Sequence, residues 1–275
     1  MADGTQNDPW IVETYAELVE KAAADCYIRL GKDINITDEY PDGDMPTLEM
    51  ADCDIDGGGK TIANWYKITS GYCIANTDNT DTLCNIHDLF IKNIYIESSC
   101  TAFCKRAEDT NARSFFTNCK FSGVMKKQFT DDSSSTLRFD TCSFNIDLDS
   151  NKPFGSNGGF FNNCFVRFRS DYASGGFFSD ITLTANARDS YFELDLPSLA
   201  GGNYLDQYGH GFINSVLDVT SDSGFYVGGG SHAVSIIHKD HAPNCHPDGT
   251  NVKGVPASDW LNVTALHDTY GFNAG

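Results

Sequence analysis

The chain has 275 residues, and its 38 acidic and 19 basic side chains give a formal net charge of −19. A field of this sign repels nucleic-acid phosphates, so the charge argues against binding to DNA or RNA. The sequence contains no apolar run of about 18 residues and no secretory signal at its first residues, so we expect no membrane insertion and folding in a reducing host cytoplasm.

The first part of the chain combines an arm, a helix and strands. Residues 1–13 predict an extended N-terminal arm that carries Trp10. The segment Thr14-Tyr15-Ala16-Glu17 is a capping box, and the apolar residues after it predict one short helix at about residues 15–24. Alternating apolar residues then predict short strands within residues 27–36.

The middle of the chain contains a short phrase that returns about every 22 to 26 residues. Residues 116–121 reappear in varied form at residues 139–144 and 161–166, with their cysteines 23 and 22 positions apart, and weaker copies occur on both sides. A fixed period of this size indicates identical structural units stacked along an axis. The predicted core positions of the units are Trp65, Ile94, Cys119, Cys142, Cys164, Ser190 and Ser215.

The residue before the core position is usually asparagine. Asparagine tolerates the left-handed backbone of a tight turn, and stacked asparagines can pass amide hydrogen bonds from unit to unit. The predicted turn ladder consists of Asn64, Asn93, Asn118, Asn163 and Asn214.

The chain has ten cysteines, and three of them occupy equivalent core positions of the repeat. Coils stacked at roughly 4.8 Å would place Cys119, Cys142 and Cys164 in one internal column, where cysteine behaves as a small hydrophobe. Reduced core thiols are therefore our main interpretation, and disulfides or a metal or redox role are the alternatives. We expect no cofactor.

The capped helix, the strand at residues 28–34, the glycine-rich segment at residues 55–62 and the Asn-Cys-x-Phe repeat together resemble the opening of a right-handed parallel β-helix. This is the pectate-lyase-like architecture, which is shared with spike and fibre proteins of tailed bacteriophages. The resemblance spans residues 14–240. It implies an all-β, single-stranded right-handed parallel β-helix of about eight or nine coils, with the helix closing the N-terminal end, and it also implies a homotrimer.

The sequence changes in texture after about residue 240. We expect residues 241–275 to form a C-terminal cap or docking segment, with a helical turn from Ser258 to about residue 268. Its aromatic and apolar residues could close the end of the solenoid or contact a partner. The candidate anchor residues at the two ends of the chain are Trp10, Trp260, Leu261 and Phe272.

Three tripeptide or dipeptide motifs resemble those of polygalacturonase-type glycosidases, which are also β-helices. They are Asn76-Thr77-Asp78, Asp131-Asp132 and Gly209-His210-Gly211. Their spacing separates them by two and three coils, and three coils correspond to about 14 Å, which exceeds the roughly 5 to 9.5 Å between working carboxylates. We therefore predict no catalytic residues from these motifs.

Two further groups could carry chemistry. The first is a set of acidic and basic residues in adjacent coils, which could form either a calcium-dependent lyase face or a solvated, charge-balanced flank. Its members are Asp140, Asp147, Asp149, Arg138, Arg167 and Arg169. The candidate metal ligands are His238, His241, Cys245 and His246, whose spacing loosely resembles a zinc site and is also that of ordinary loop residues.

These observations leave three classes of function. The first is a non-enzymatic structural or adhesion component of a bacteriophage virion, such as a fibre, spike or decoration protein at the virion surface, bound to other virion proteins and contacting a host surface glycan. The alternatives are a carbohydrate-active β-helix enzyme (a polysaccharide lyase or glycosidase) and a cellular adhesion or scaffold solenoid. The candidate glycan-contact residues are Tyr172, Tyr204, Tyr208 and Tyr226.

Overall fold

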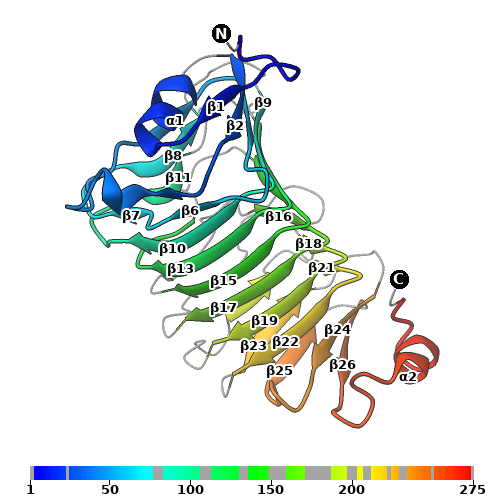
Figure 1. Ribbon diagram of the computed structural model, residues 1–275. Coiled ribbons are helices and arrows are strands. Elements are labelled where there is room, and N and C mark those ends of the chain that lie inside the picture. Colours follow the sequence, from blue (N-terminus) through cyan, green and yellow to red (C-terminus); the bar gives the residue numbers. More distant parts are fainter. Residues whose placement is uncertain are drawn as a thin grey trace.

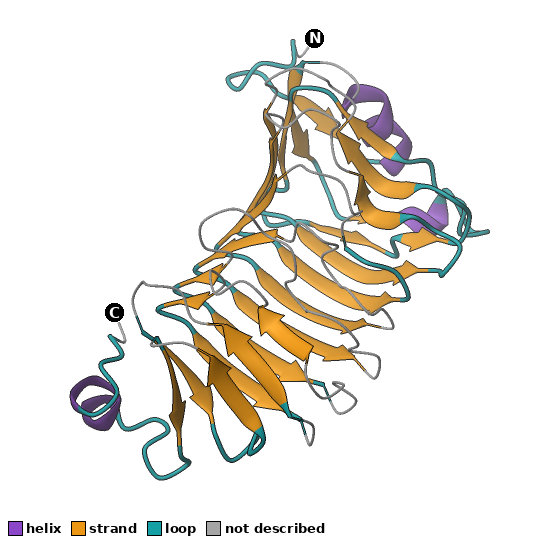
Figure 2. Cartoon of the chain, turned by 180° about the vertical axis from the view of Figure 1, so that it is seen from behind, coloured by secondary structure: helices purple, strands orange, loops and turns teal. Residues whose placement is uncertain are grey.

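The computed structural model shows an elongated parallel β-solenoid in which strands from successive coils lie side by side (Figures 1 and 2). Pairing between the named strands is parallel throughout. The structure describes residues 3–22, 25–76, 83–105, 113–129, 136–148, 159–170, 187–196, 203–206, 212–221, 224–228, 234–248 and 251–273.

Two long sheets run along the solenoid. Within the described ranges, sheet 1 has nine strands in the order β1 (Trp10–Val12), β2 (Cys26–Leu30), β5 (Cys53–Asp56), β9 (Leu83–His87), β12 (Arg113–Thr117), β14 (Thr136–Asp140), β16 (Gly159–Asn162), β18 (Ala187–Arg188) and β21 (Phe212–Ile213). Sheet 2 has eleven: β3 (Ile34–Asn35), β6 (Thr61–Ala63), β7 (Tyr66–Lys67), β10 (Phe90–Ile96), β13 (Lys120–Met125), β15 (Ser143–Leu148), β17 (Phe165–Ser170), β19 (Tyr191–Asp195), β22 (Val216–Thr220), β24 (Ser235–His238) and β26 (Val252–Val255).

The third side of the solenoid carries two shorter sheets. Sheet 3 consists of β4 (Leu48–Met50), β8 (Tyr72–Asn76) and β11 (Ala102–Lys105), and sheet 4 consists of β20 (Asn203–Asp206), β23 (Phe225–Gly228) and β25 (Cys245–Asp248). The helical elements are α1 (Tyr15–Ala22), the short 3-10 helix at Ile36–Asp38 and α2 (Val263–Asp268). None of the helices in the described part of the chain is long and apolar enough to cross a membrane.

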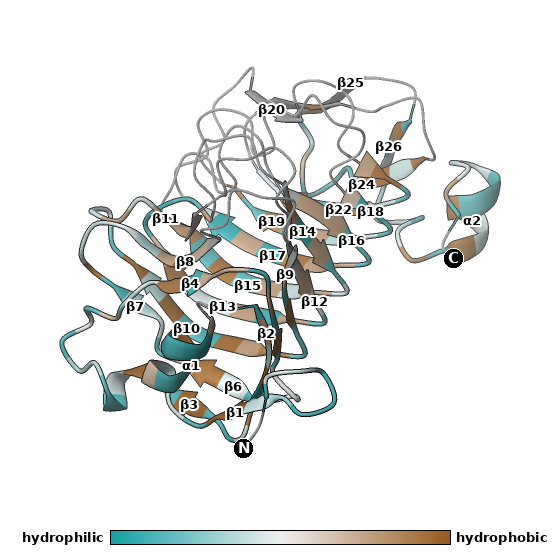
Figure 3. Cartoon of the chain, turned by 90° about the horizontal axis from the view of Figure 1, so that it is seen from above, coloured by the Kyte–Doolittle hydropathy of each residue, from teal (hydrophilic) through white to brown (hydrophobic). Residues whose placement is uncertain are grey.

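The core is built from columns of equivalent apolar residues, because alternate residues of a strand point to the same face. Figure 3 shows hydrophobic and hydrophilic segments in turn along the strands of sheet 2. The inward column of sheet 1 contains Ile28, Ile55, Ile86, Phe116, Phe139 and Phe161. The facing column of sheet 2 contains Ile62, Ile91, Phe121, Phe144, Val166 and Phe192.

Phenylalanine rings stack along these columns in the middle of the solenoid. Phe116 and Phe139 have ring centroids 5.3 Å apart, and Phe121 and Phe144 are 4.7 Å apart, with nearly parallel planes in both pairs. Across the core, Phe139 meets Phe144 edge to face at 5.0 Å. Repeated Phe in the sequence phrase therefore becomes a continuous aromatic core that links each coil to the next.

At the corner between sheet 1 and sheet 2, successive coils each have one residue in the left-handed backbone conformation. Positive φ angles occur at Asp88, Asn118, Thr141, Asn163, Asp189 and Asn214. The amide of Asn118 donates to the carboxylate of Asp88, and that of Asn214 donates to Asp189 at 2.7 Å. Side-chain hydrogen bonds of this kind link neighbouring corners, although aspartate and threonine share the column with asparagine.

The predicted alignment of the repeat is wrong at its first two units. Strand pairing aligns Phe90 with Lys120, so Leu89 is the counterpart of Cys119, and Ile94 lies opposite Gly123 instead. Trp65 is level with Ile94 and is likewise buried. The reason is that this coil has two left-handed residues, Asp88 at the corner and Asn93 within β10. The bend at Asn93 shifts the pairing of β10 with β13.

Asn64 and Asn93 therefore belong to a separate ladder within sheet 2. The Asn93 amide donates to Asn64 at 3.1 Å, and the Asn64 amide donates to Asn35 at 2.7 Å. Both Asn64 and Asn93 have positive φ angles, as the sequence suggested, but they form a different bend from that of Asn118, Asn163 and Asn214.

The residue after the corner points inward and forms a column that begins with a leucine and continues with small polar side chains. The members are Leu89, Cys119, Cys142, Cys164, Ser190, Ser215 and Ser235, all of them buried. The backbone N–H of Cys119 donates to Sγ of Cys142 at 3.4 Å, and that of Cys164 donates to Oγ of Ser190 at 3.0 Å. In the same way, Oγ of Ser215 accepts from the backbone N–H of Ser190, and the backbone N–H of Ser215 donates to Oγ of Ser235.

The thiols and hydroxyls of this column also donate to carbonyls of the chain. Sγ of Cys142 lies 3.2 Å from the carbonyl oxygen of Phe116, and Oγ of Ser190 lies 2.7 Å from that of Arg188. The column is thus more than a stack of small hydrophobes, because each of its cysteine and serine side chains forms a hydrogen bond with a backbone group of the bend. None of the ten cysteines, which all lie within the described residues, forms a disulfide bond.

The N-terminal segment differs from the predicted arm. Strand β1 pairs with β2 and extends sheet 1, and Trp10 is half-buried with the ammonium of Lys21 over its ring. Helix α1 contacts β1, β2 and β4 and buries Tyr15, Leu18 and Ala22. The N-terminal segment is therefore part of the solenoid, because β1 has a parallel strand partner and α1 buries one face. Residues 23 and 24 of the predicted helix lie outside the described ranges.

The start of α1 is capped by two segments. Thr14 Oγ1 accepts from the N–H of Glu17 at 3.2 Å, as a capping box requires, but the Glu17 carboxylate accepts from Glu13 rather than from Thr14. The carboxylate of Glu39 accepts from the N–H groups of Tyr15 and Ala16 at 2.7 and 2.9 Å. This long-range cap ties the helix to the first coil.

The C-terminal segment also differs from its predicted boundaries. Strand β26 continues sheet 2 beyond residue 240, and α2 begins after Asn262, which caps it through the N–H of Ala265, rather than at Ser258. Phe272 is buried and Trp260 half-buried in a cluster with Ile236, Val255 and Leu266, whereas Leu261 is 87% exposed.

The corner column predicts different effects for two substitutions of Cys142. Cys142→Ser keeps an acceptor for the N–H of Cys119 and copies the serines of later coils, so we expect a loss of stability within about 1 kcal/mol. Cys142→Val keeps apolar volume but leaves that N–H without a partner, so we expect a loss of about 1 to 3 kcal/mol. Chemical denaturation measures both, and a valine variant as stable as the serine variant would contradict the hydrogen-bonding role.

Candidate functional site

Most residues of the glycosidase-like motifs lie outside the described part of the chain. This holds for Thr77-Asp78, Asp131-Asp132 and Gly209-His210-Gly211, while Asn76 ends β8 with its side chain outside the description. The same is true of the proposed glycan contacts, since Tyr172 and Tyr208 are not described and Tyr204 and Tyr226 are placed only as backbone in β20 and β23.

The proposed metal ligands near residue 240 do not converge. His238 and His241 stack with ring centroids 3.8 Å apart, and Nδ1 of His241 lies 2.6 Å from the carboxylate of Asp218. Burial raises the pKa of Cys245 to about 12, and this thiol packs against the core. These three do not form a ligand group, and the side chain of His246 is outside the described residues. For this trio the geometry therefore gives no support to the zinc alternative, and the two histidine rings stack on each other instead.

The proposed lyase face is also divided. Arg138 and Asp140 belong to β14 in sheet 1 and pair with each other at 2.9 Å. Asp147, Arg167 and Arg169 belong to sheet 2, so the two halves lie on different faces of the solenoid. Asp149 lies outside the described residues.

The outer face of sheet 2 carries a shallow polar strip, which we call the sheet 2 strip. Two adjoining hollows of about 490 and 540 Å³ share the residues Asn145 and Arg167. One hollow extends towards Asp218 and His241, and the other towards Phe90 and Lys120. The strip follows the solenoid axis because its residues are outward-facing neighbours in successive coils.

An aromatic pair adjoins the sheet 2 strip, and one of its members, Phe165, lines the hollow that extends towards Phe90. Phe165 in β17 and Tyr191 in β19 are paired in register, and their rings stack 5.5 Å apart with an interplanar angle of 3°. Phe165 is 43% exposed although it is a large apolar side chain. Burial and then the charge of Asp218 raise the pKa of Tyr191 to about 12, so its hydroxyl is a hydrogen-bond donor at neutral pH.

Ion pairs extend the strip beside the aromatic pair. Nε of Arg167 lies 3.1 Å from the carboxylate of Glu193, and Nε of Arg169 lies 3.7 Å from that of Asp195. These pairs cross between β17 and β19, because equivalent positions of adjacent parallel strands lie side by side. The strip therefore offers flat aromatic surface and fixed charged groups in one line.

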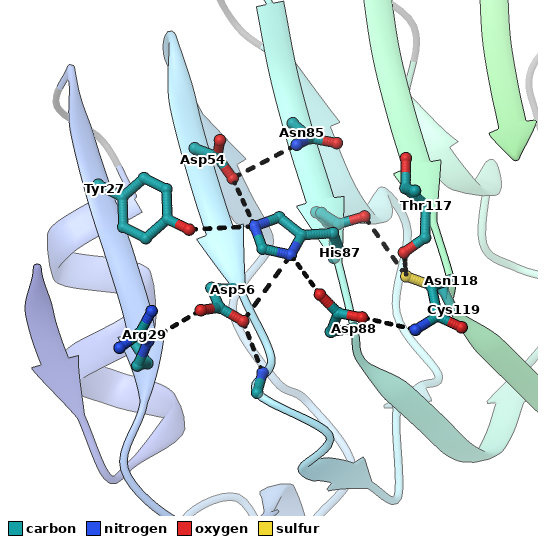
Figure 4. Close-up of polar contacts among 12 residues, drawn as sticks. Tyr27, Arg29, Asp54, Asp56, Asn85, His87, Asp88, Thr117, Asn118 and Cys119 are labelled. Carbon is teal, nitrogen blue, oxygen red and sulfur yellow. Dashed lines mark hydrogen bonds and ion pairs between the residues drawn. The ribbon is translucent and has the colours of Figure 1, made fainter. Parts of the chain in front are cut away.

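The outer face of sheet 1 carries a second cluster, centred on His87 (Figure 4). The carboxylate of Asp88 lies 2.8 Å from Nδ1 of His87, and that of Asp56 lies 3.8 Å from the same nitrogen. On the other side of the ring, Asp54 lies 3.2 Å from Nε2, and the hydroxyl of Tyr27 lies 3.3 Å from it.

The electrostatics of the His87 cluster follow from these contacts. The hydrogen bond to Asp54 is the largest influence on the pKa of His87; burial, the second largest, lowers this pKa, and the hydrogen bond to Asp88 raises it again, so that the pKa is about 9. The hydrogen bonds from His87 and then Asn118 lower the pKa of Asp88. The ring is thus an imidazolium at neutral pH when no other cation is present.

Sequence reasoning missed this cluster. The available signals were the alternation Asp54-Ile55-Asp56, which places two carboxylates on one face of a strand, and the adjacent pair His87-Asp88. Nothing in the sequence says that these two segments are neighbours, because that depends on the pairing of Asp56 with His87 in β5 and β9.

Comparisons with known proteins found no matching protein-family model, curated protein or solved structure.

The raised pKa of His87 predicts a specific dependence of stability on pH. Its folded-state pKa exceeds its unfolded value near 6.5, so its contribution is fully present below pH 6.5 and is lost as pH rises towards 9. We expect the difference in unfolding free energy between the unaltered protein and His87→Gln to narrow by on the order of 2 kcal/mol across this window.

Chemical denaturation at several pH values in chelator-containing buffer measures this difference. His267→Gln is the matched control, because His267 contacts Asp268 at 2.9 Å but is largely exposed. A pH-independent difference for His87→Gln would contradict the assigned protonation.

Proposed function

We propose that this protein is a non-enzymatic structural or adhesion component of a bacteriophage particle, and that the sheet 2 strip binds an extended carbohydrate at a host surface. The observation that carries the carbohydrate part is the exposed ring of Phe165, which stacks on the half-buried ring of Tyr191 beside the ion pair of Arg167 and Glu193. The phage setting is supported by the sequence resemblance.

The chemistry of the strip suits a sugar chain. A pyranose ring presents a C–H face that packs on an aromatic ring and hydroxyls that bind charged and amide groups at its edge. Phe165 supplies the exposed apolar surface, while Asn145, Arg167 and Glu193 supply donors and acceptors around it. Repetition from coil to coil at roughly 4.8 Å favours an extended polymer over a compact ligand.

The charge of the strip narrows the class of sugar. In the hollow that extends towards Phe90, the charged lining residues are Lys92, Lys120 and Arg167, whereas the lining of the other hollow also includes Asp147, Glu193, Asp195 and Asp218. A local concentration of cations on an acidic protein favours ligands that carry carboxylate or phosphate groups. Acidic bacterial surface polysaccharides are therefore the preferred ligand class.

A carbohydrate-active enzyme is the second candidate, because carboxylates and arginines share one hollow of the strip. A glycosidase needs one carboxyl group that donates a proton and another that acts as base or nucleophile. Glu193 and Asp195 are instead each engaged by an arginine, which favours a binding role.

The C-terminal end has features of an attachment segment. Leu261 and Val263 are 87% and 64% exposed and adjoin the packed residues Trp260 and Leu266. Exposed apolar residues on a well-packed base are typical of contact with another protein. Attachment to other virion proteins through this end, and a homotrimer, are parts of the proposal, and light scattering of the purified protein tests the trimer.

The proposal predicts that Phe165→Ala combined with Tyr191→Ala weakens glycan binding at least about tenfold, since loss of about 1.4 kcal/mol of ring contact has that effect. Binding is measured with immobilised acidic and neutral bacterial capsular polysaccharides and lipopolysaccharides. Val263→Ala is the control, because Val263 is exposed but lies on α2, outside the strip.

The same samples are assayed for new reducing ends and unsaturated sugar products. Binding without cleavage is the expected result. Cleavage that requires Glu193 or Asp195 would establish the enzymatic alternative, and the absence of binding to any polysaccharide would contradict the carbohydrate role.

A further inference from the structure

The His87 cluster lies on sheet 1, whereas the sheet 2 strip lies on the other long sheet, so the two can be considered independently. Within the described residues, Asp56, His87 and Asp88 form the one group of three potential metal ligands whose ligand atoms all lie within 4.8 Å of one another. We propose that these three residues bind one divalent first-row transition-metal ion, such as Zn²⁺, through Nδ1 of His87 and one oxygen of each carboxylate.

The direction of the side chains supports this assignment. Nδ1 of His87 faces both carboxylates, as Figure 4 shows, with Asp88 at 2.8 Å and Asp56 at 3.8 Å. An ion between the three atoms would replace a proton on this nitrogen and would screen the two carboxylates from each other. One imidazole with two carboxylates is a ligand set for Zn²⁺, Fe²⁺ or Mn²⁺ that leaves coordination positions for water.

Each ligand is also held by a second contact on its far side. Asp54 lies 3.2 Å from Nε2 of His87, and this carboxylate-to-histidine contact orients the ring and directs Nδ1 to the site. The other oxygen of Asp56 pairs with Nε of Arg29 at 2.8 Å, and the other oxygen of Asp88 accepts from Asn118. Supporting contacts of this type are typical of metal ligands, and all of them are present here.

The backbone around the site is tightly determined. Gly57 follows Asp56 directly, and a Cβ atom at this position would collide with the backbone of Asp88, so only glycine allows the two acidic segments to approach. The N–H of Gly59 donates to the carbonyl of Asp88 at 2.8 Å, and the N–H of Gly58 donates to the carboxylate of Asp56 at 2.7 Å. The turn therefore holds the carboxylate of Asp56 and the backbone of Asp88 in place before any ion binds.

The position of the site suggests what the ion would do. Asp56 ends β5, His87 ends β9 in the next coil and Asp88 is the corner residue that follows β9, so an ion bound by all three would join two successive coils at their corner. Such a link would add to the hydrogen bonds between these strands. The ion is thus structural, and the inference does not depend on the proposed function.

The experiment is a titration of the full chain with ZnCl₂ and CoCl₂ after removal of bound metal by a chelator and dialysis. Isothermal titration calorimetry should show one ion per chain. His87→Gln and Asp56→Asn should each weaken binding at least about tenfold, and Asp54→Asn, which alters the contact to Nε2 but keeps all three proposed ligands, should weaken it about 10- to 100-fold. His267→Gln is the matched control, because its His-Asp pair has the same local contact without a third ligand.

Cobalt absorption separates this site from the cysteines. Binding through one imidazole and carboxylates gives weak visible bands and no thiolate-to-cobalt charge-transfer band. Circular dichroism shows whether each variant is folded, and Asp88→Asn gives an independent test if His87→Gln does not fold.

Three results would overturn the proposal: no stoichiometric binding to the unaltered protein, binding that persists in folded Asp56→Asn or Asp88→Asn, or a thiolate band. Glycan binding by His87→Gln should equal that of the unaltered protein, so failure of this inference is distinct from failure of the proposed function.

Discussion

Register between parallel strands is the constraint on which the rest of this structure depends. Each coil lies over the one before it, so a residue in one coil meets its counterpart in the next, as Phe116, Phe139 and Phe161 do in sheet 1. A slip by one residue would turn every inward side chain outward. The stacked phenylalanines favour the correct register, and the register in turn gives the core its continuous aromatic contacts.

The corner between the long sheets preserves that register from coil to coil. A left-handed residue such as Asn118 turns the chain, and the inward residue that follows, such as Cys119, engages backbone groups of the bend. Cysteine and serine share this column because both are small and both can donate and accept a hydrogen bond. Leu89, at the first position of the column, shows that the requirement is weaker near the N-terminal coils.

The same register places functional side chains on the outer faces. In sheet 2 it aligns Phe165 with Tyr191 and Arg167 with Glu193, which produces a strip along the solenoid axis. In sheet 1 it aligns Arg29, Asp56 and His87 across three strands, which produces a compact polar cluster. A solenoid thus presents extended surfaces for polymers and local clusters for ions from one repeated geometry.

The sequence by itself determined the solenoid, because the 22- to 26-residue period and the Asn-Cys-x-Phe phrase are local patterns that reflect the turn and the core of each coil. It also indicated the capped helix α1, whose signals lie within a few residues. Only the tertiary structure showed that Ile94 lies opposite Gly123, that Trp10–Val12 joins sheet 1 and that Asp56 meets His87 and Asp88. These contacts depend on which residues of different coils are paired, and strand pairing across variable loops is not encoded in any local pattern.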